Sequence, residues 1–152
     1  MDAAIRQLVV FNLADQRYAL HLSAVERVVL IAELTALPNA PEIVLGIINV
    51  RGCIVPVVDT RKRFGLPARE INLSDHLIIA HTSRRVVALL ADVVGGVVQH
   101  SRAAITAAEQ ILCNVEYVEG VVKLDDGLAL IHDLDTFLSA LEERTLEQAL
   151  LS

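Results

Sequence analysis

The sequence predicts a mainly β protein made of two similar, small barrels of about five strands each. Hydrophobic residues make up 54% of the chain but aromatic residues only 3%, so valine, leucine and isoleucine must build the core. β-Branched side chains fit the pleated, half-buried surface of a sheet. Short apolar runs alternate with turn signals, and the same order of runs occurs twice. A length of 152 residues suits one domain, or two small halves that share a core.

The first part of the chain predicts a hairpin and a third strand. Residues 8–13 and 17–22 are β-rich and flank a short turn. Ser23 and Glu26 have the spacing of a capping box, which predicts a helical turn before a strand at 28–31. Residues 33–40 are expected to form a loop. Pro41 then suits the first position of a short helix over 42–45.

The stretch GIINVRGCIVPVVD, residues 46–59, is the strongest hairpin signal. Apolar runs flank the Arg51-Gly52 step, and glycine adopts the backbone angles that a short hairpin loop requires. Asn49 and Arg51 are therefore presented near the turn, where an arginine is available to a partner. The alternative is that Arg51 is only a solvated turn residue. Asp59 can cap a helical turn over 60–64.

The second part predicts more hairpins and a final helix. The polar segment 68–75 links the halves, alanines favour a helical turn at 106–111, and Asp133 can cap a turn through Leu138. Ser139 and Glu142 form a capping box that opens a last helix to about residue 150. Its apolar face would carry Leu141, Leu146, Ala149 and Leu150. The strands are expected at 76–82, 85–91, 93–99, 117–124 and 128–132.

An internal duplication organises these elements. Gly46 and Asp59 align without a gap on Gly120 and Asp133, and the segment from Leu8 aligns on the segment from Leu77. Shared apolar patterning alone is the competing explanation. The duplication predicts a first barrel over 8–67, a second over 76–132 and a C-terminal helical segment over 133–152. Each half is too small to bury a large core, so we expect the barrels to pack through aliphatic side chains.

Composition and charge narrow the function classes. A formal charge of −6 without a basic stripe argues against nucleic acid or an anionic membrane as partner. No apolar run reaches the roughly 18 residues that span a bilayer, and no secretory signal is evident. Cys53 and Cys113 have no pattern and are expected to be free, buried thiols in a reducing cytoplasm.

The sequence contains none of the short motifs that are typical of catalytic, zinc or phosphate-binding sites. The histidines and cysteines lack zinc-site spacing, and there is no nucleophile elbow or phosphate-binding glycine loop. An enzyme would have to use His81, Asp92 or Cys53, which no motif connects. We therefore expect neither catalysis, nor a metal, nor a cofactor.

The residues 46–66, GIINVRGCIVPVVDTRKRFGL, resemble the CheW family of coupling proteins in bacterial chemosensory arrays. That family shows the pattern G-x-x-N-L-R-G-x-I-V-P-V-V-D-L-R-x-x-F. The second-half segment YVEGVVKLDDGLALIHDLDTFL resembles its closing hairpin and helix. Val50 and Thr60 stand where leucine is usual, and residues 105–113 replace a segment that is often rich in proline.

The resemblance implies two SH3-like five-stranded barrels and a non-catalytic adaptor. It implies two partners, the regulatory domain of a CheA-type histidine kinase and the cytoplasmic tip of methyl-accepting chemoreceptors. The protein would then be cytoplasmic, in receptor arrays at the inner face of the membrane. The kinase contact would lie on the second-half barrel or its matching face, with no residues assigned. The receptor-facing residues would be Asn49, Val50, Arg51 and Gly52, with Val25 and Arg27 lining the same groove.

Alternative functions belong to other classes. A pocket between the barrels could make the protein a small-ligand sensor. A CheW-like adaptor could also serve pilus-based motility or a second-messenger pathway instead of a flagellar motor.

Overall fold

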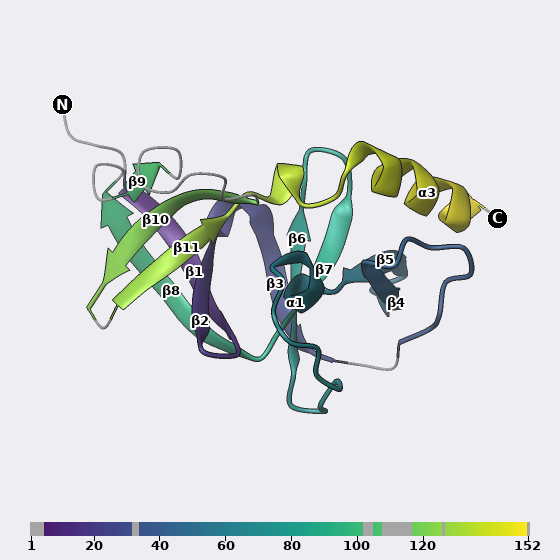
Figure 1. The fold of residues 1–152 in the computed structure, drawn as a ribbon, viewed down its shortest axis with the longest axis horizontal. Coiled ribbons are helices and arrows are strands. Elements are labelled where there is room, and N and C mark those ends of the chain that lie inside the picture. The colour runs from purple at the N-terminus through teal and green to yellow at the C-terminus, as the bar shows by residue number, and fades with distance from the viewer. Residues whose placement is uncertain (1–4, 32–33, 102–104, 108–116, 126, 152) are drawn as a thin grey trace.

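A computed structural model describes residues 5–31, 34–101, 105–107, 117–125 and 127–151. Two twisted sheets lie side by side along the long axis of the molecule, and a C-terminal helix lies at the end that carries the second sheet (Figure 1). The mainly β prediction is confirmed. Sheet A has the strand order β8 (Val93–Ser101), β1 (Ile5–Leu13), β2 (Gln16–His21), β11 (Gly127–His132), β10 (Val118–Leu124) and β9 (Ile105–Ala107). Sheet B has the order β3 (Val25–Leu30), β6 (His76–His81), β7 (Val86–Ala91), β5 (Cys53–Val58) and β4 (Val44–Val50).

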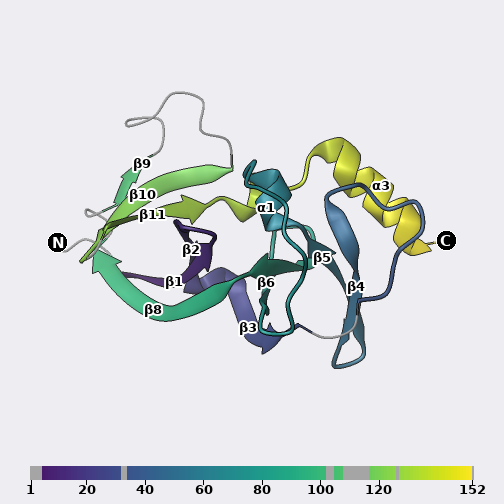
Figure 2. The same ribbon diagram turned by 60° about the horizontal axis from the view of Figure 1, so that its bottom comes forward.

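Short helices connect and cover the sheets. They are the 3-10 turns η1 (Leu22–Ala24) and η3 (Leu134–Thr136) and the α-helices α1 (Thr60–Arg63) and α3 (Ala140–Leu151). In a second view, α3 again lies beside sheet B, next to β4 (Figure 2).

The division into barrels at 8–67 and 76–132 is wrong, because each half exchanges its first hairpin. β1 and β2 join sheet A, whereas β6 and β7 join sheet B. The short connection between β2 and β3 forces this exchange. In sheet A, β8 and β2 both run antiparallel to β1. For β3 to take the place of β8, the chain would have to return along a whole strand, about 20 Å. The three residues of η1 span at most about 10 Å.

The duplication itself is confirmed by the strand pairing. Sheet B repeats five strands of sheet A in the same order, and equivalent residues oppose each other in both. A bulge before Gly46 in β4 recurs before Gly120 in β10. The equivalent pairs include Val9–Leu20 and Ile78–Leu89, Gly120–Ile131 and Gly46–Val57, and Ile131–Ala19 and Val57–Ala88.

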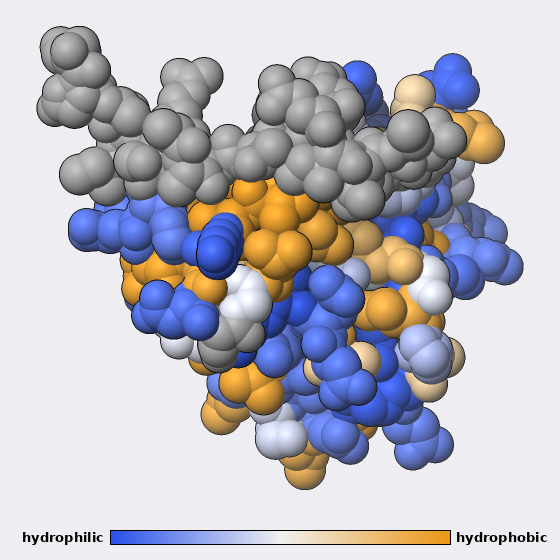
Figure 3. Space-filling view, turned by 60° about the vertical axis from the view of Figure 1, so that its left-hand side comes forward, coloured by the Kyte–Doolittle hydropathy of each residue, from blue (hydrophilic) through white to orange (hydrophobic). Residues whose placement is uncertain are grey.

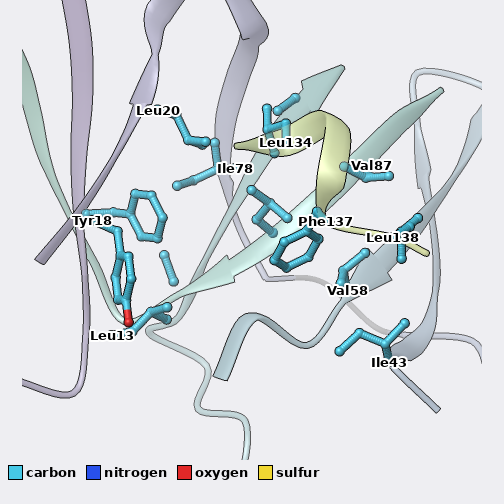
Figure 4. Close-up of a cluster of buried hydrophobic side chains, with 14 of the residues drawn as sticks. Leu13, Tyr18, Leu20, Ile43, Val58, Ile78, Val87, Leu134, Phe137 and Leu138 are labelled. Atoms are coloured by element: carbon cyan, nitrogen blue, oxygen red, sulfur yellow. The ribbon is translucent and has the colours of Figure 1, made fainter. Parts of the chain in front are cut away.

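The core has three clusters of buried side chains. One lies on the inner face of each curled sheet, and the third lies between the two sheets. Side chains alternate along β6, so that Leu77 and Ile79 pack within sheet B while Ile78 and Ala80 pack in the interface. Burial on both faces explains why these strands read as continuous apolar runs. Figure 4 shows the interface, where side chains from both sheets meet Phe137. The two units pack through apolar side chains as expected, but the interface is only partly aliphatic, because Phe11, Tyr18 and Phe137 are buried in it.

The caps predicted at Asp59 and at Ser139 are also confirmed. The Asp59 side chain accepts a hydrogen bond from the Lys62 N–H at 3.1 Å, and Gly65 ends the turn with φ +72°. Ser139 and Glu142 form the reciprocal capping box, with distances of 3.1 Å and 2.9 Å.

Three local predictions differ from the structure. The helix expected at 42–45 is a single turn, closed by a hydrogen bond of 2.9 Å from the Val44 N–H to the Pro41 carbonyl, because β4 already begins at Val44. The helical turn expected from Ser23 is the 3-10 turn η1. Among the described residues no side chain caps it, so the predicted capping box of Ser23 and Glu26 does not form. Of the helix expected at 106–111, the described part belongs to β9, because its backbone pairs with the edge of β10. Residues 108–111 and Cys113 lie outside the described residues.

Candidate docking groove

The β4–β5 hairpin has a two-residue turn whose geometry is set by its central residues. Arg51 has φ +51° and Gly52 has φ +85°, between the paired residues Val50 and Cys53. Positive φ at both positions is typical of a type I′ turn, whose twist matches that of the strands. The Asn49 side chain accepts a hydrogen bond of 2.8 Å from the Gly52 N–H. Asn49 and Gly52 therefore shape the turn that presents Arg51.

A groove of about 490 Å³ lies beside this hairpin. Its lining comes from the β4–β5 hairpin, β3, β6, the start of β7 and the last turn of α3. Ile54 is 54% exposed, so apolar surface in the groove is open to solvent. Its aliphatic lining consists of Val50, Ile54, Val55, Pro56, Ile79, Val86 and Leu150.

The groove is basic, although the chain as a whole carries a charge of −6. Arg27, Arg51 and Arg85 line it together with one acid, Glu26. The Arg85 Nε lies 2.6 Å from the Glu143 Oε1 on α3, and both side chains are largely buried. Arg27 and Arg51 form no ion pair with any residue that the structure describes. Both guanidinium groups are thus available to an acidic partner.

The structure brings together only part of the predicted receptor-facing set. Val50, Arg51 and Arg27 line this groove. Asn49 and Gly52 act on the turn, and neither is among the lining residues. Val25 instead packs against the interface between the sheets.

Other groove residues were missed or misplaced by sequence reasoning. Cys53 lines the groove and is exposed, so the expected buried thiol is a wrong prediction. It begins β5 directly after the turn, beyond the part of the strand that the core covers. Arg85 and Leu150 reach the groove from distant parts of the chain, and only the apolar face predicted for the last helix pointed to Leu150.

Sheet A carries an equivalent groove of about 580 Å³. By the internal repeat, its residues Leu124 and Asp125 correspond to Val50 and Arg51. Figure 3 turns this end of the molecule forward and shows apolar surface beside hydrophilic side chains. The duplication thus provides two similar hollows in which an arginine at one turn is replaced by an acid at the other.

The residues that an enzyme could use lie in different places and have structural partners. The His81 Nδ1 lies 3.8 Å from the Glu26 Oε2, and both side chains are about half exposed. Asp92 accepts hydrogen bonds from Arg61 at 2.5 Å and from Arg69 at 2.6 Å. Partial burial would raise the pKa of Asp92, but the Ala14 N–H and the two arginines hold it below its ordinary value. Within the described ranges, no group of three His, Cys, Asp or Glu residues could hold a metal ion.

His132 is a core residue, not an accessible base. It is buried between Phe64 and Phe137, with ring centroids 4.9 Å and 4.3 Å away. Burial lowers its pKa to about 3. Neither ring nitrogen has a hydrogen-bond partner among the described residues. The imidazole is therefore neutral and contributes packing.

None of the described helices is long and apolar enough to cross a bilayer.

Comparisons with known proteins agree with this architecture. The model of the CheW-like domain family matches residues 7–142. The chain is 32% identical to the chemotaxis protein CheW of Rhizobium meliloti, over 91% of this chain and 90% of that protein. It is 31% identical to CheW of Thermotoga maritima, over 91% of this chain and 89% of that protein. The crystal structure of the scaffolding protein TtCheW from Thermoanaerobacter tengcongensis superposes with a TM-score of 0.82 and 31% identity. That superposition covers 93% of this chain and 96% of TtCheW. The chain therefore belongs to the CheW-like domain family, as its hairpin motif and its duplicated sheets indicated.

Proposed function

We propose that this CheW-like, non-catalytic chemotaxis scaffold couples a CheA-type histidine kinase to the cytoplasmic tip of methyl-accepting chemoreceptors. The groove beside Arg51 would receive the receptor. The observation that carries this proposal is an open aliphatic groove edged by Arg27 and Arg51, neither of which has an acidic partner among the described residues. The family match supports the scaffold class, and no comparison favours a small-ligand sensor.

The chemistry of the groove suits a helical partner. A receptor tip is a helical hairpin, and the apolar stripe of one helix could cover Val50, Ile54 and Val86. Arg51 would then meet a carboxylate or a helix carbonyl at the edge of the contact, where charge contributes mainly to specificity and association rate. A moderate affinity is sufficient, because an array multiplies many such contacts.

The kinase requires a second surface if one molecule is to hold both partners at once. The equivalent groove on sheet A supports this requirement, because equivalent positions of the repeat line it and its turn carries a different charge. We propose it as the kinase-facing side. Coupling of these partners places the protein in the cytoplasm, at receptor arrays on the inner face of the membrane.

Charge reversal at Arg51 tests the receptor site. Arg51→Glu should weaken binding of a purified receptor-tip fragment about tenfold, which corresponds to roughly 1.4 kcal/mol of binding free energy. Thermal unfolding should be unchanged, because the side chain is exposed. Kinase-domain binding should be unchanged, because the proposed kinase-facing groove lies on sheet A. Arg144→Glu, on the exposed side of α3, is the matched control and should bind like the parent. Equal affinities for parent and Arg51→Glu would remove Arg51 from the site.

A further inference from the structure

We infer that the last turn of α3 is part of the docking groove and that Leu150 helps to determine which helix binds there. This inference rests on the proposed function and assigns a specificity role to an element outside the hairpin motif. Leu150 also lies outside residues 7–142, which the family model matches.

The position of α3 is fixed by contacts along its length. Leu146 is fully buried and Ala149 is 5% exposed, and Leu146 packs in the interface between the sheets. One turn earlier, Glu143 forms its 2.6 Å ion pair with Arg85. Because Arg85 also lines the groove, the same ion pair that anchors the helix holds one of the groove's arginines in place.

These anchors direct one leucine of the last turn to the groove. Leu150 lines the groove and is partly buried against the interface cluster. Its neighbour Leu151 is 81% exposed and is not among the lining residues. Adjacent residues on a helix face directions about 100° apart, so only one of the two can serve this wall. The chain thereby offers a matched pair of identical side chains.

The occupant that fits is an amphipathic helix with an aliphatic stripe and an acidic flank. Leu150 adds to an apolar lining that the hairpin and β7 begin. Arg85 is paired with Glu143, but Arg27 and Arg51 have no ion pair with the described residues and outnumber Glu26 in the lining. A helix with basic residues beside its apolar stripe would meet like charge, and a wholly polar helix would leave the aliphatic lining in water.

Polar substitution of the two leucines tests the assignment. Leu150→Ser should weaken binding of the receptor-tip fragment at least fivefold in a calorimetric titration, whereas Leu151→Ser should stay within twofold of the parent. Leu150→Met keeps the volume and apolar character of the side chain and should also stay within twofold. Kinase-domain affinity, measured on the same samples, should be unchanged in all three variants.

The outcomes separate this inference from the proposed function. If Leu150→Ser binds the receptor fragment like the parent while Arg51→Glu does not, α3 has no part in the groove and the proposed function stands. If Leu150→Ser loses both partners to the same degree, Leu150 serves only the stability of the fold, and the inference is overturned. A parent protein that does not bind the receptor fragment would overturn both.

Discussion

His132 illustrates how one residue can look functional and still serve packing. The internal repeat places it at the position equivalent to Val58, a fully buried aliphatic residue of the interface. Its own surroundings are Phe64 and Phe137. A buried N–H without a partner costs about 1–3 kcal/mol, so histidine is a poorer choice than valine for stability at this site.

The depressed pKa of His132 predicts acid sensitivity. The folded-state pKa is about 3 and the ordinary value is 6.5, so the folded state binds fewer protons between these values. The stability that depends on a neutral His132 is therefore fully present above about pH 6.5 and is lost as the pH falls toward 3. His132→Val should reduce this loss by a few kcal/mol, on the order expected for a shift of several pKa units.

Urea unfolding of parent and variant at pH 7.5 and pH 4.5 measures this difference. His81→Val is the control, because His81 is exposed and its ion pair among the described residues is a long one, 3.8 Å from the Nδ1 to the Glu26 Oε2. If His132→Val loses as much stability on acidification as the parent does, His132 is not the group responsible.

At the scale of an element, β4 depends on a close approach that only glycine allows. The carbonyl oxygen of Thr35 would lie 2.7 Å from a Cβ added at Gly46. The same carbonyl accepts a hydrogen bond of 2.8 Å from the Ile47 N–H, and the Thr35 N–H donates to the Ile47 carbonyl at 3.0 Å. Close packing against the Thr35 backbone therefore explains why the hairpin motif begins with glycine.

Gly46→Ala should lower the free energy of unfolding by about 2 kcal/mol, because a methyl group against backbone cannot be relieved by a side-chain movement. Gly95→Ala is the matched control in a strand, since its added Cβ would lie 3.5 Å from the Val10 carbonyl oxygen, an ordinary contact. Chemical unfolding of both variants gives the two values. Equal losses would mean that the Thr35 contact does not limit the size of residue 46.

At the scale of the whole molecule, Asp92 lies where the chain passes from sheet B to sheet A. It follows β7 and precedes β8, accepts hydrogen bonds from Arg61 and Arg69, and accepts another at 2.8 Å from the Ala14 N–H in the β1–β2 turn of sheet A. Arg69 also binds Asp75, 2.9 Å away, which ties the linker between the halves to the same point. One carboxylate thus joins both sheets and the linker.

Asp92→Ala should destabilise the protein by about 2 kcal/mol at pH 7, because two arginines and one N–H lose their acceptor together. Since the pKa of Asp92 is lowered in the folded state, the stability it provides is present above its ordinary pKa. That stability is lost as the pH falls through the lowered value. Glu70→Ala removes an exposed carboxylate of the same linker and should change stability little. Thermal unfolding at pH 7 compares them, and similar melting temperatures for all three proteins would contradict the role of Asp92.

Much of the fold could be predicted because its signals are local. The short apolar strand runs, the Arg51-Gly52 turn, the Asp59 cap and the Ser139–Glu142 capping box depend on residues within a few positions of each other. The errors arose where a local preference met a long-range constraint. The helix predicted over 106–111 gave way at Ala107 to pairing with β10, and the predicted burial of Cys53 depended on where the sheet core ends.

By itself, the sequence determined that two copies of one strand-rich unit follow each other, that Arg51 stands at a tight turn, and that the core is aliphatic. Only the tertiary structure decided that each unit gives its first hairpin to the other sheet. It also decided that Arg27, Arg85 and Leu150 join Arg51 around one groove. The physical reason is one of range. Turn and strand preferences act between neighbours, whereas the partner of a hairpin and the walls of a groove depend on how far a connection can reach and on which surfaces, far apart in the chain, pack together.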